Sequence, residues 1–313
     1  MKVLIVSSIY PDTIDELRKD HDVVCAFNAN DAEFKEAIVD REVVIMRSGV
    51  QLSADVMKCA PGLKLILRAG SGFDNIDVNH VDEVGLRLIR IPGPGAKAVA
   101  EMSFAFMLAL ARNILEADRL TRQGHWAKHQ LTGELLTDKR LGIVGAGNIG
   151  TRVGQLGVAW GMEAIGCVEP ATPEEAARLQ ADGIRMTDFE EVISTSDFIS
   201  IHVPLSEQTR NLVDAEELAM MKEGAYLVNL ARGGVVNEQA LHNALTSGHL
   251  AGAGVDVHVN EGEGKISPLA NLPNVILTPH IGAGTIDSQR EIGEIIIETV
   301  KAFEVEQAVA VAV

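Results

Sequence analysis

The stretch LGIVGAGNIG, residues 141–150, decides the fold of this 313-residue chain. Three glycines, Gly145, Gly147 and Gly150, follow an apolar run in the spacing G-x-G-x-x-G and precede a helical pattern. The first glycine permits a tight turn, the second lets the backbone approach a pyrophosphate, and the third lets helix and strand pack closely. The stretch therefore predicts the strand, turn and helix that begin a dinucleotide-binding α/β domain.

An acidic residue in the next apolar run adds weight to this interpretation, because the glycines alone would also fit a turn without a ligand. Glu169 ends that run about 20 residues after the third glycine, where a carboxylate accepts hydrogen bonds from the adenosine ribose. The stretch EPATPEEAA (169–177) contains no Arg or Lys to meet a 2′-phosphate. We therefore expect NAD as the cofactor, in preference to NADP.

Short apolar runs alternate with helical patterns on both sides of this stretch, which is typical of parallel sheets covered on both faces. The first series consists of KVLIVSS (2–8), DVVCAF (22–27), EVVIMRS (42–48), LKLILRAG (63–70) and LRLIRIP (86–92). The second consists of KRLGIVGAG (139–147), EAIGCVEP (163–170), DFISIHVP (197–204), GAYLVNLA (224–231), GAGVDVHV (252–259) and NVILTPH (274–280).

Two helices link the series. A Pro/Gly turn breaks the rhythm near residue 95, and a long helix is predicted from Ala96 to about Gln123. A last helix, from about Thr285 to Phe303, is expected to return to the first series. We therefore expect two doubly wound parallel-sheet α/β domains, residues 1–95 plus 285–313 and residues 96–284. The crossings near residues 95 and 284 would form a hinge over a cleft between them.

Bulk composition excludes several classes of function. Lys and Arg total 27 against 44 Asp plus Glu, and the formal net charge of −17 repels phosphate backbones and anionic membrane surfaces. We therefore expect no nucleic-acid or membrane partner. A chain of 313 residues also exceeds the size at which single cores stop growing, which again favours two domains.

Three further features favour a cytoplasmic protein. The start MKVLIVSSI (1–9) has no small-residue cleavage site, so a first strand is expected there and not a signal peptide. The apolar block SFAFMLALA (103–111) is shorter than the roughly 20 residues of a membrane span and predicts a buried helix. Cys25, Cys59 and Cys167 have no metal-ligand spacing and fit reduced, buried thiols. No metal site is expected.

Polar residues at the ends of consecutive strands of the second series suggest an active site. In VNLARGGVVNE (228–238), Arg232 stands against two glycines, and an inward-directed positive charge needs an anion. In ILTPHIGAG (276–284), His280 is suited to take and return a hydroxyl proton, since imidazole titrates near neutral pH. Asp256, Glu261 and Glu263 are the candidates for a carboxylate that orients His280, and spacing alone does not choose between them.

Five ordered motifs make these features specific. RAGSGFDNID (68–77), GIVGAGNIG (142–150), VNLARGG (228–234), GAGVDV (252–257) and TPHIGAG (278–284) resemble the D-isomer-specific 2-hydroxyacid dehydrogenases, and most of all the catalytic part of the D-3-phosphoglycerate dehydrogenases. The resemblance covers nearly the whole chain. It implies a flavodoxin-like substrate-binding domain built from both chain ends, an inserted Rossmann NAD domain, and a homodimer formed through the Rossmann domains.

The resemblance also implies roles for individual residues. Arg232 would bind the carboxylate and carbonyl oxygen of a small anionic substrate, His280 would be the acid and base, and Glu261 its partner. Asp256 would hold the nicotinamide carboxamide. The expected NAD contacts are Gly145, Gly147, Asn148, Ile149, Gly150, Glu169, Val203, Leu230, Ala231, Asp256 and Gly282. The expected substrate contacts are Arg47, Ser48 and the backbone N–H groups of Ser71 and Gly72.

Two departures from the family pattern affect these expectations. In DVHVNEGEGKISPL (256–269), His258 replaces an aromatic residue and Gly262 a proline, so Glu263 is an alternative to Glu261. The chain also ends at Val313 without the regulatory domain of many phosphoglycerate dehydrogenases, so serine feedback is not expected. Lys128 is a candidate to reach a partner subunit's site.

The expected activity is NAD-dependent oxidation of a D-2-hydroxy acid to a 2-oxo acid, or the reverse. The first candidate is D-3-phosphoglycerate to 3-phosphohydroxypyruvate, in serine biosynthesis. A reductase of glyoxylate, hydroxypyruvate or another 2-oxo acid is the alternative within the same class. An NAD-sensing interaction protein is the alternative from a different class, and turnover of any 2-oxo acid would argue against it.

Overall fold

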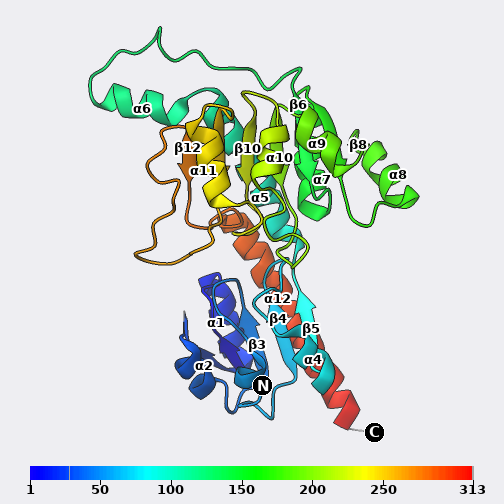
Figure 1. Cartoon of the computed structure of the whole chain (residues 1–313). Helices are drawn as coiled ribbons and strands as arrows, with labels where there is room; N and C mark the ends of the chain where they lie inside the picture. Colours follow the sequence, from blue (N-terminus) through cyan, green and yellow to red (C-terminus); the bar gives the residue numbers. More distant parts are fainter. Residues whose placement is uncertain (28, 312–313) are drawn as a thin grey trace. The chain divides into compact units, whose positions relative to one another are not determined.

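The computed structural model describes residues 1–27 and 29–311. The chain divides into two compact units, Met1–Gly95 with Ala283–Val313, and Ala96–Gly282 (Figure 1). Within the described residues the strands form two parallel sheets, one of five strands and one of seven. The expected pair of parallel-sheet α/β domains is thereby confirmed. The cleft expected between them stays a prediction.

The first unit has the strand order β2-β1-β3-β4-β5, which is the flavodoxin-like order. Every neighbouring pair runs parallel, and the two central strands β3 and β4 are buried along their whole length. The strands are β1 (Lys2–Ile5), β2 (Asp22–Cys25), β3 (Val43–Met46), β4 (Leu65–Arg68) and β5 (Arg87–Arg90).

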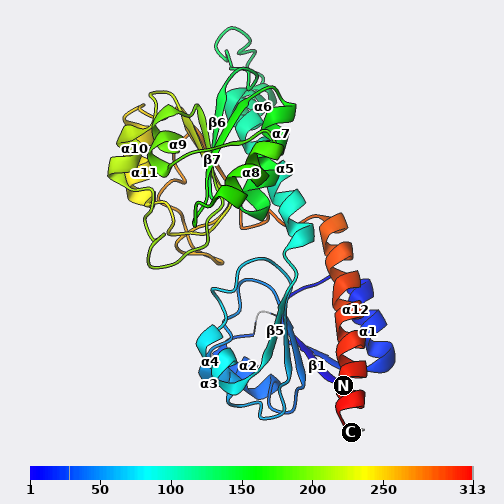
Figure 2. The same cartoon turned by 90° about the vertical axis from the view of Figure 1, so that its right-hand side faces the viewer.

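The last helix of the chain belongs to this first unit, as the sequence predicts. It lies beside α1 (Figure 2). Its Ile292, Ile296, Val300 and Phe303 are buried in one core with the apolar side chains of β1, β3 and β4. The helix is longer than expected and extends to Val311. The helices of the unit are α1 (Pro11–Asp20), α2 (Asp31–Ala37), α3 (Ala54–Met57), α4 (Val78–Val84) and α12 (Ile286–Val311).

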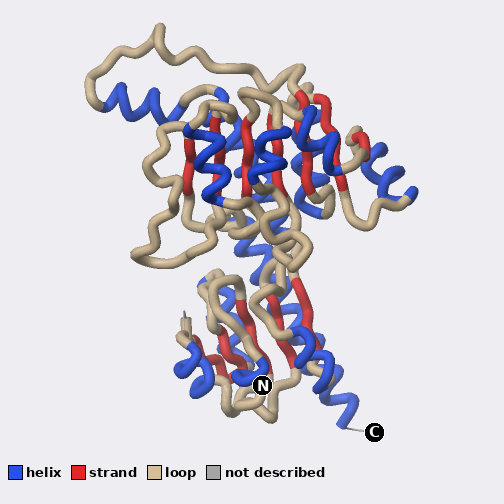
Figure 3. The backbone as a smooth tube through the Cα atoms, in the orientation of Figure 1, coloured by secondary structure: helices blue, strands red, loops and turns tan. Residues whose placement is uncertain are grey.

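The strands of the second unit lie side by side in one sheet (Figure 3). The sheet is doubly wound, with the order β12-β11-β10-β9-β6-β7-β8. The chain moves outward from β6 to β8 and then returns to place β9 on the other side of β6. This reversal is the topological switch point at which open α/β sheets bind ligands. The strands are β6 (Arg140–Val144), β7 (Glu163–Cys167), β8 (Arg185–Met186), β9 (Phe198–Ile201), β10 (Tyr226–Asn229), β11 (Gly252–Val255) and β12 (Val275–Leu277). The two-residue strand β8 was not predicted, because it is too short to form an apolar run.

One helix predicted for this unit is wrong in its extent. The expected helix from Ala96 to about Gln123 is two helices, because Asn113 adopts a left-handed backbone conformation with φ 52°. The helices are α5 (Gly93–Ala111), α6 (Ile114–Arg122), α7 (Asn148–Ala159), α8 (Pro173–Ala181), α9 (Phe189–Thr195), α10 (Ala215–Met220) and α11 (Glu238–Thr246).

Helix α5 contains the apolar block that the sequence predicts to be buried. With its flanking residues it is 19 residues long, and it is the one helix among the described residues that is long and apolar enough to cross a membrane by composition. Its most apolar window is 61% buried inside the protein, as a core helix would be. Phe104, Met107 and Leu110 are among its buried side chains, which confirms the expected buried helix.

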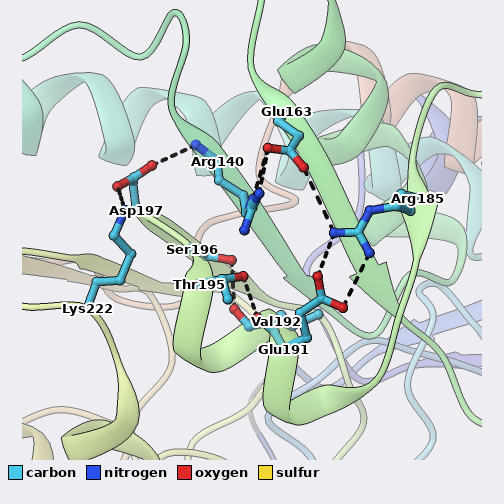
Figure 4. Close-up of polar contacts among 9 residues, drawn as sticks. All are labelled: Arg140, Glu163, Arg185, Glu191, Val192, Thr195, Ser196, Asp197 and Lys222. Carbon is cyan, nitrogen blue, oxygen red and sulfur yellow. Dashed lines mark hydrogen bonds and ion pairs between the residues drawn. The ribbon is translucent and has the colours of Figure 1, made fainter.

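Charged side chains at the starts of the strands pair along the amino edge of the seven-stranded sheet (Figure 4). Arg140 binds Glu163 through Nε and Nη2 at 3.0 and 2.9 Å. Arg185 binds Glu191 at 2.7 Å and lies 3.9 Å from Glu163. Asp197 accepts a hydrogen bond from the backbone N–H of Arg140 at 2.8 Å. These pairs connect β6, β7 and β8 to the turn before β9.

Candidate functional site

The opposite, carboxyl edge of the same sheet gathers most of the residues that the sequence singles out. Gly145 follows β6, Glu169 follows β7, Arg232 follows β10 and His280 follows β12. Asp256 directly follows β11, between the last two. Because the strands are parallel, their carboxyl ends lie along one edge, where ligands of open α/β sheets bind.

The three glycines of the fingerprint differ in the atoms that surround them. Gly145 has φ 91°, and a Cβ there would lie 2.7 Å from Val203 and 2.9 Å from the backbone of His202. A Cβ at Gly150 would collide with the carbonyl oxygen of Gly145. A Cβ at Gly147, in contrast, would meet no atom within 4 Å. The first and third glycines therefore serve packing, while the second leaves open space beside the backbone, as binding of a dinucleotide pyrophosphate requires.

The start of helix α7 also fits an anion. Gly147 is its N-cap and gives no side-chain hydrogen bond to the first turn. Backbone N–H groups at a helix N-terminus, together with the helix dipole, attract phosphate. Asn148 is exposed beside the open space, Ile149 is partly buried and Glu169 is exposed after β7. The residues present therefore fit NAD.

The other predicted cofactor contacts line the neighbouring strand ends. Val203 packs beside Gly145, where a Cβ would lie 2.7 Å from its side chain. Leu230 and Ala231 are buried after β10, and a Cβ at Gly282 would lie 3.3 Å from Leu230. The structure thus brings the ends of β6, β9, β10 and β12 into one region. Their contacts with NAD stay predictions.

His280 and Glu261 form a pair in this region. The imidazole Nδ1 lies 3.0 and 2.9 Å from the two carboxylate oxygens of Glu261. Partial burial raises the pKa of Glu261, but the hydrogen bond and charge of His280, together with the charge of His258 and its backbone N–H bond, outweigh it, so its pKa is lowered overall. Of the two glutamates that the sequence left open, the structure therefore brings Glu261 to His280, while Glu263 lies in the exposed part of the same loop.

The loop that presents His280 is held by Asp256. His280 has φ 56°, a left-handed conformation that is unusual outside glycine and concentrates at functional sites. The buried carboxylate of Asp256 accepts hydrogen bonds from Thr278 Oγ1 at 2.5 Å and from the N–H groups of Ile281 and Gly282 at 2.8 and 2.7 Å. Asp256 therefore fixes the turn around His280, a role that the sequence did not indicate. Its expected contact with the nicotinamide stays a prediction.

Arg232 lies in a turn that is fixed by its neighbours. Buried Asn229 binds the backbone of Ala231 and Arg232 at 3.0 and 3.2 Å, and Arg232 Nη1 donates to the carbonyl oxygen of Ala231 at 2.7 Å. A Cβ at Gly233 would collide with the carbonyl group of His258. The first glycine after Arg232 therefore lets the loop that follows β11 pack against the arginine turn.

The predicted substrate residues of the first unit follow β3 and β4. Arg47 is partly buried, and this burial lowers its pKa. Its backbone N–H donates to Ser7 Oγ at 2.9 Å, and Asn75 Nδ2 donates to its carbonyl oxygen at 3.0 Å. Ser48 and Ser71 are exposed, and Gly72 is partly exposed. Their contacts with a substrate stay predictions.

Sequence reasoning missed Arg178, which helix α8 brings back to the glycine-rich loop. Its Nη2 donates to the carbonyl oxygen of Ala146 at 2.7 Å. Arg178 directly follows the stretch EPATPEEAA (169–177), which itself contains no basic residue. No local pattern in the sequence would have revealed the contact, because it joins segments 32 residues apart.

His202 is a second residue that the sequence did not single out. It follows β9 beside Gly145, and burial lowers its pKa to about 3, so the ring is neutral. Its Nε2 lies 2.8 Å from Ser200 Oγ, and its buried Nδ1 has no hydrogen-bond partner among the described residues. A neutral His202 ring adds no positive charge to this edge.

The cysteines and metal-ligating residues offer no further site in the described part of the chain. Cys25, Cys59 and Cys167 are free, as expected, but they are partly buried and not fully buried. Burial raises the pKa of the Cys25 and Cys167 thiols. Among residues 1–27 and 29–311, no group of three or more His, Cys, Asp or Glu side chains could hold a metal ion.

Comparisons with known proteins show the family to which the chain is related. The family model described as D-isomer specific 2-hydroxyacid dehydrogenase, NAD binding domain, matches residues 104–282. The hydroxypyruvate reductase of Thermotoga maritima is 40% identical over 270 residues, which are 86% of each chain. The D-3-phosphoglycerate dehydrogenase of Methanocaldococcus jannaschii is 38% identical over 302 residues, which are 96% of this chain and 57% of that protein.

Solved structures have a similar fold. The D-lactate dehydrogenase of Aquifex aeolicus, in complex with NAD and lactic acid, superposes with a TM-score of 0.86 at 29% identity. The superposition covers 96% of this chain and 95% of that one. The chain thus spans little more than half the length of the phosphoglycerate dehydrogenase above, and nearly the full length of the lactate dehydrogenase.

Proposed function

The chain belongs to the D-isomer-specific 2-hydroxyacid dehydrogenase family, whose members are NAD-dependent oxidoreductases acting on CH–OH groups, and on this basis we propose the same activity for it. The reaction is the oxidation of a D-2-hydroxy acid to its 2-oxo acid, or the reverse. The pairing of His280 with Glu261 at the edge that holds the glycine-rich loop is the observation that supports it most. The remaining residues of the edge supply the other parts of the reaction.

His280 acts as the acid and base. When bound, NAD supplies the acceptor for the hydride that leaves C2 of the substrate. Nδ1 of His280 is engaged by Glu261, so Nε2 is the atom that takes the hydroxyl proton. The carboxylate stabilises the imidazolium that results and keeps the ring in one orientation. In the reverse direction Nε2 returns the proton to the oxygen.

Arg232 binds the reacting end of the substrate. A guanidinium clamps a carboxylate through two parallel hydrogen bonds, and it also stabilises negative charge that develops on the neighbouring oxygen. The turn that Asn229 and Gly233 fix holds the arginine in place. Asp256 contributes through the turn that presents His280.

Arg47 supports 3-phosphoglycerate as the substrate. Its guanidinium is partly buried, and no carboxylate among the described residues forms an ion pair with it. A partly buried cation of this kind is suited to a phosphate or another distal anion. The relative from Thermotoga maritima, which matches over most of both chains, favours hydroxypyruvate as the alternative substrate.

Steady-state kinetics with 3-phosphoglycerate, hydroxypyruvate and glyoxylate test both proposals. Loss of a contact that holds ground state and transition state alike raises KM and spares kcat. Arg47→Ala should therefore raise KM for 3-phosphoglycerate by a factor about ten times larger than the factor by which it raises KM for glyoxylate. Arg232→Ala should instead lower kcat on every substrate. If Arg47→Ala affects both substrates equally, or wild type ignores 3-phosphoglycerate, the protein is a general 2-oxo acid reductase. Absence of turnover on every acid would instead favour the NAD-sensing alternative.

We also propose that the protein is a cytoplasmic homodimer, formed through the second unit. Exposed apolar side chains gather on α6 and the segment after it: Ile114 and Leu115 are about half exposed, Leu135 is 68% and Trp126 84% exposed. Lys128 is exposed in the same segment, where it would reach a partner's site. Sedimentation equilibrium should give a dimer for wild type and a monomer for Leu115→Ser/Trp126→Ser. A monomeric wild type would contradict this proposal.

A further inference from the structure

Arg178 lies on the surface of helix α8, yet its side chain reaches back to the glycine-rich loop. Nη1 donates to Thr151 Oγ1 at 2.7 Å, and Nη2 donates to the carbonyl oxygen of Ala146 at 2.7 Å. Ala146 is the residue between the first two glycines of the fingerprint, and Thr151 is in the first turns of α7. The Arg178 guanidinium thus binds both the glycine-rich loop and helix α7, which follows that loop.

The Ala146 carbonyl receives a second donor from the same network. The hydroxyl of Thr151, which is buried, donates to it at 3.1 Å. Two donors therefore fix the direction of this carbonyl. A trans peptide is planar, with its C=O and N–H groups pointing in opposite directions, so the N–H of Gly147 is fixed as well. Gly147 is the position that faces open space where the pyrophosphate would lie.

Glu175 holds Arg178 in this orientation. Its Oε2 accepts from Nε at 2.8 Å and from Nη2 at 2.6 Å, and Thr172 caps the helix turn that contains it. All three guanidinium nitrogens therefore donate hydrogen bonds. Nε and Nη2 bind Glu175, Nη2 also binds the Ala146 carbonyl, and Nη1 binds Thr151. The ion pair between Arg178 and Glu175 lies within helix α8 and would form without the loop. It therefore does not explain why the Arg178 guanidinium also binds Ala146, 32 residues away.

We propose that Arg178 is a positioning residue of the cofactor site, which orients the Ala146–Gly147 peptide for the pyrophosphate of NAD. The inference rests on the proposed cofactor site and does not depend on the substrate. Lysine would not reproduce this role, because an ammonium lacks the planar fork that bonds two acceptors at once. Arg178 is expected to affect cofactor affinity and not the chemical step.

Isothermal titration calorimetry with NAD, ADP-ribose and adenosine tests the proposal. Arg178→Gln should weaken binding of NAD and ADP-ribose about tenfold, the size expected for loss of charge-assisted hydrogen bonds, and leave adenosine binding unchanged. Arg178→Lys should restore part of the loss. The melting temperature of each variant is measured in parallel, so that loss of folding is recognised.

Three variants separate the loop contact from a general surface effect. Arg185→Gln removes an exposed arginine that pairs with a helix glutamate on the amino edge, and it should leave NAD affinity unchanged. Glu175→Gln, which spares the loop bonds of Arg178, should weaken NAD less than Arg178→Gln does. Thr151→Val should weaken NAD binding, and its effect should not add to that of Arg178→Gln because both act on the same carbonyl.

Several results would overturn the proposal. Equal weakening of NAD and adenosine, or additive effects of Thr151→Val and Arg178→Gln, would mean that the loop peptide is not the target. A selective loss of NADP binding in Arg178→Gln would make the arginine a phosphate ligand near the ribose. Wild type that binds no NAD would overturn the cofactor site itself, and this inference with it.

Discussion

The two edges of the seven-stranded sheet belong to the same strands, yet they use charge in opposite ways. At the amino edge, Arg140, Glu163, Arg185 and Glu191 bind one another side chain to side chain (Figure 4). At the carboxyl edge, polar side chains mostly bind loop backbone, as Asp256 does in the His280 turn. The first edge joins strand starts, whereas the second shapes loops.

From this difference we infer that the amino edge serves stability and that the carboxyl edge is the place of the proposed reaction. The charged side chains of the four residues named above bind one another at the amino edge. At the carboxyl edge, backbone contacts fix the turns, Glu261 engages only Nδ1 of the His280 ring, and a Cβ at Gly147 would meet no atom within 4 Å. Changes at the two edges should therefore separate activity from stability.

The largest expected effect is at His280. His280→Ala should lower kcat by about 10² to 10⁴, the usual contribution of general acid–base catalysis, while NAD affinity and melting temperature stay close to wild type. Glu261→Gln should shift the pH profile of kcat, because it removes the charge that faces the imidazole. Glu263→Gln is the matched control, and an equal shift in that variant would contradict the assignment of Glu261.

The second test compares two glycines of the fingerprint. Gly147→Ala should fold normally, because its Cβ meets no atom within 4 Å, but weaken NAD binding about tenfold by obstructing the pyrophosphate. Gly150→Ala should instead lower the free energy of unfolding by about 1–3 kcal/mol, since its Cβ collides with the carbonyl of Gly145. Calorimetry of binding and thermal unfolding distinguish the two. Similar stability losses in both variants would refute the distinction.

The third test concerns the choice between NAD and NADP. Glu169 is exposed after β7, and its carboxylate should repel a 2′-phosphate. Wild type should therefore have a higher kcat/KM with NAD, and Glu169→Gln should reduce the preference about tenfold. If wild type has equal kcat/KM values for both cofactors, Glu169 does not select between them, and Arg178 becomes the residue to examine.

The smallest effect is expected at the amino edge. Arg185→Gln should lower the melting temperature by at most a few degrees and leave kcat unchanged, because exposed ion pairs contribute little. Arg185 and Thr187 lower the pKa of Glu191 from 4.5 to about 2. Because the pKa of Glu191 is lower in the folded protein than in the unfolded chain, its ionised carboxylate stabilises the fold above pH 4.5. This contribution is lost as the pH falls toward 2.

The stability difference between wild type and Arg185→Gln should accordingly shrink over that pH range. Thermal unfolding at a series of pH values measures it. A difference that is independent of pH would show that the Arg185–Glu191 pair does not contribute through charge. A loss of kcat in Arg185→Gln would break the separation of the two edges.

Elements with long apolar runs were predictable from the sequence, and elements defined by one residue were not. The buried strands β3 and β4 and the fingerprint after β6 follow from local patterns, because burial on both faces demands continuous apolar residues. The break at Asn113 depends on a single left-handed residue inside an otherwise helical pattern. The strand β8 has two residues, fewer than a periodic signal needs.

The candidate site divides in the same way. The sequence by itself determined the fold class, the glycine-rich loop and the strand ends that present Arg232 and His280, because each depends on residues that are close along the chain. Only the tertiary structure decided that Glu261 and not Glu263 meets His280, that Asp256 holds the histidine turn, and that Arg178 reaches Ala146. The physical reason is that hydrogen bonds form only within about 3 Å and at suitable angles. Spacing along the chain fixes the order of such groups, whereas the packing of loops and helices fixes the distances between them.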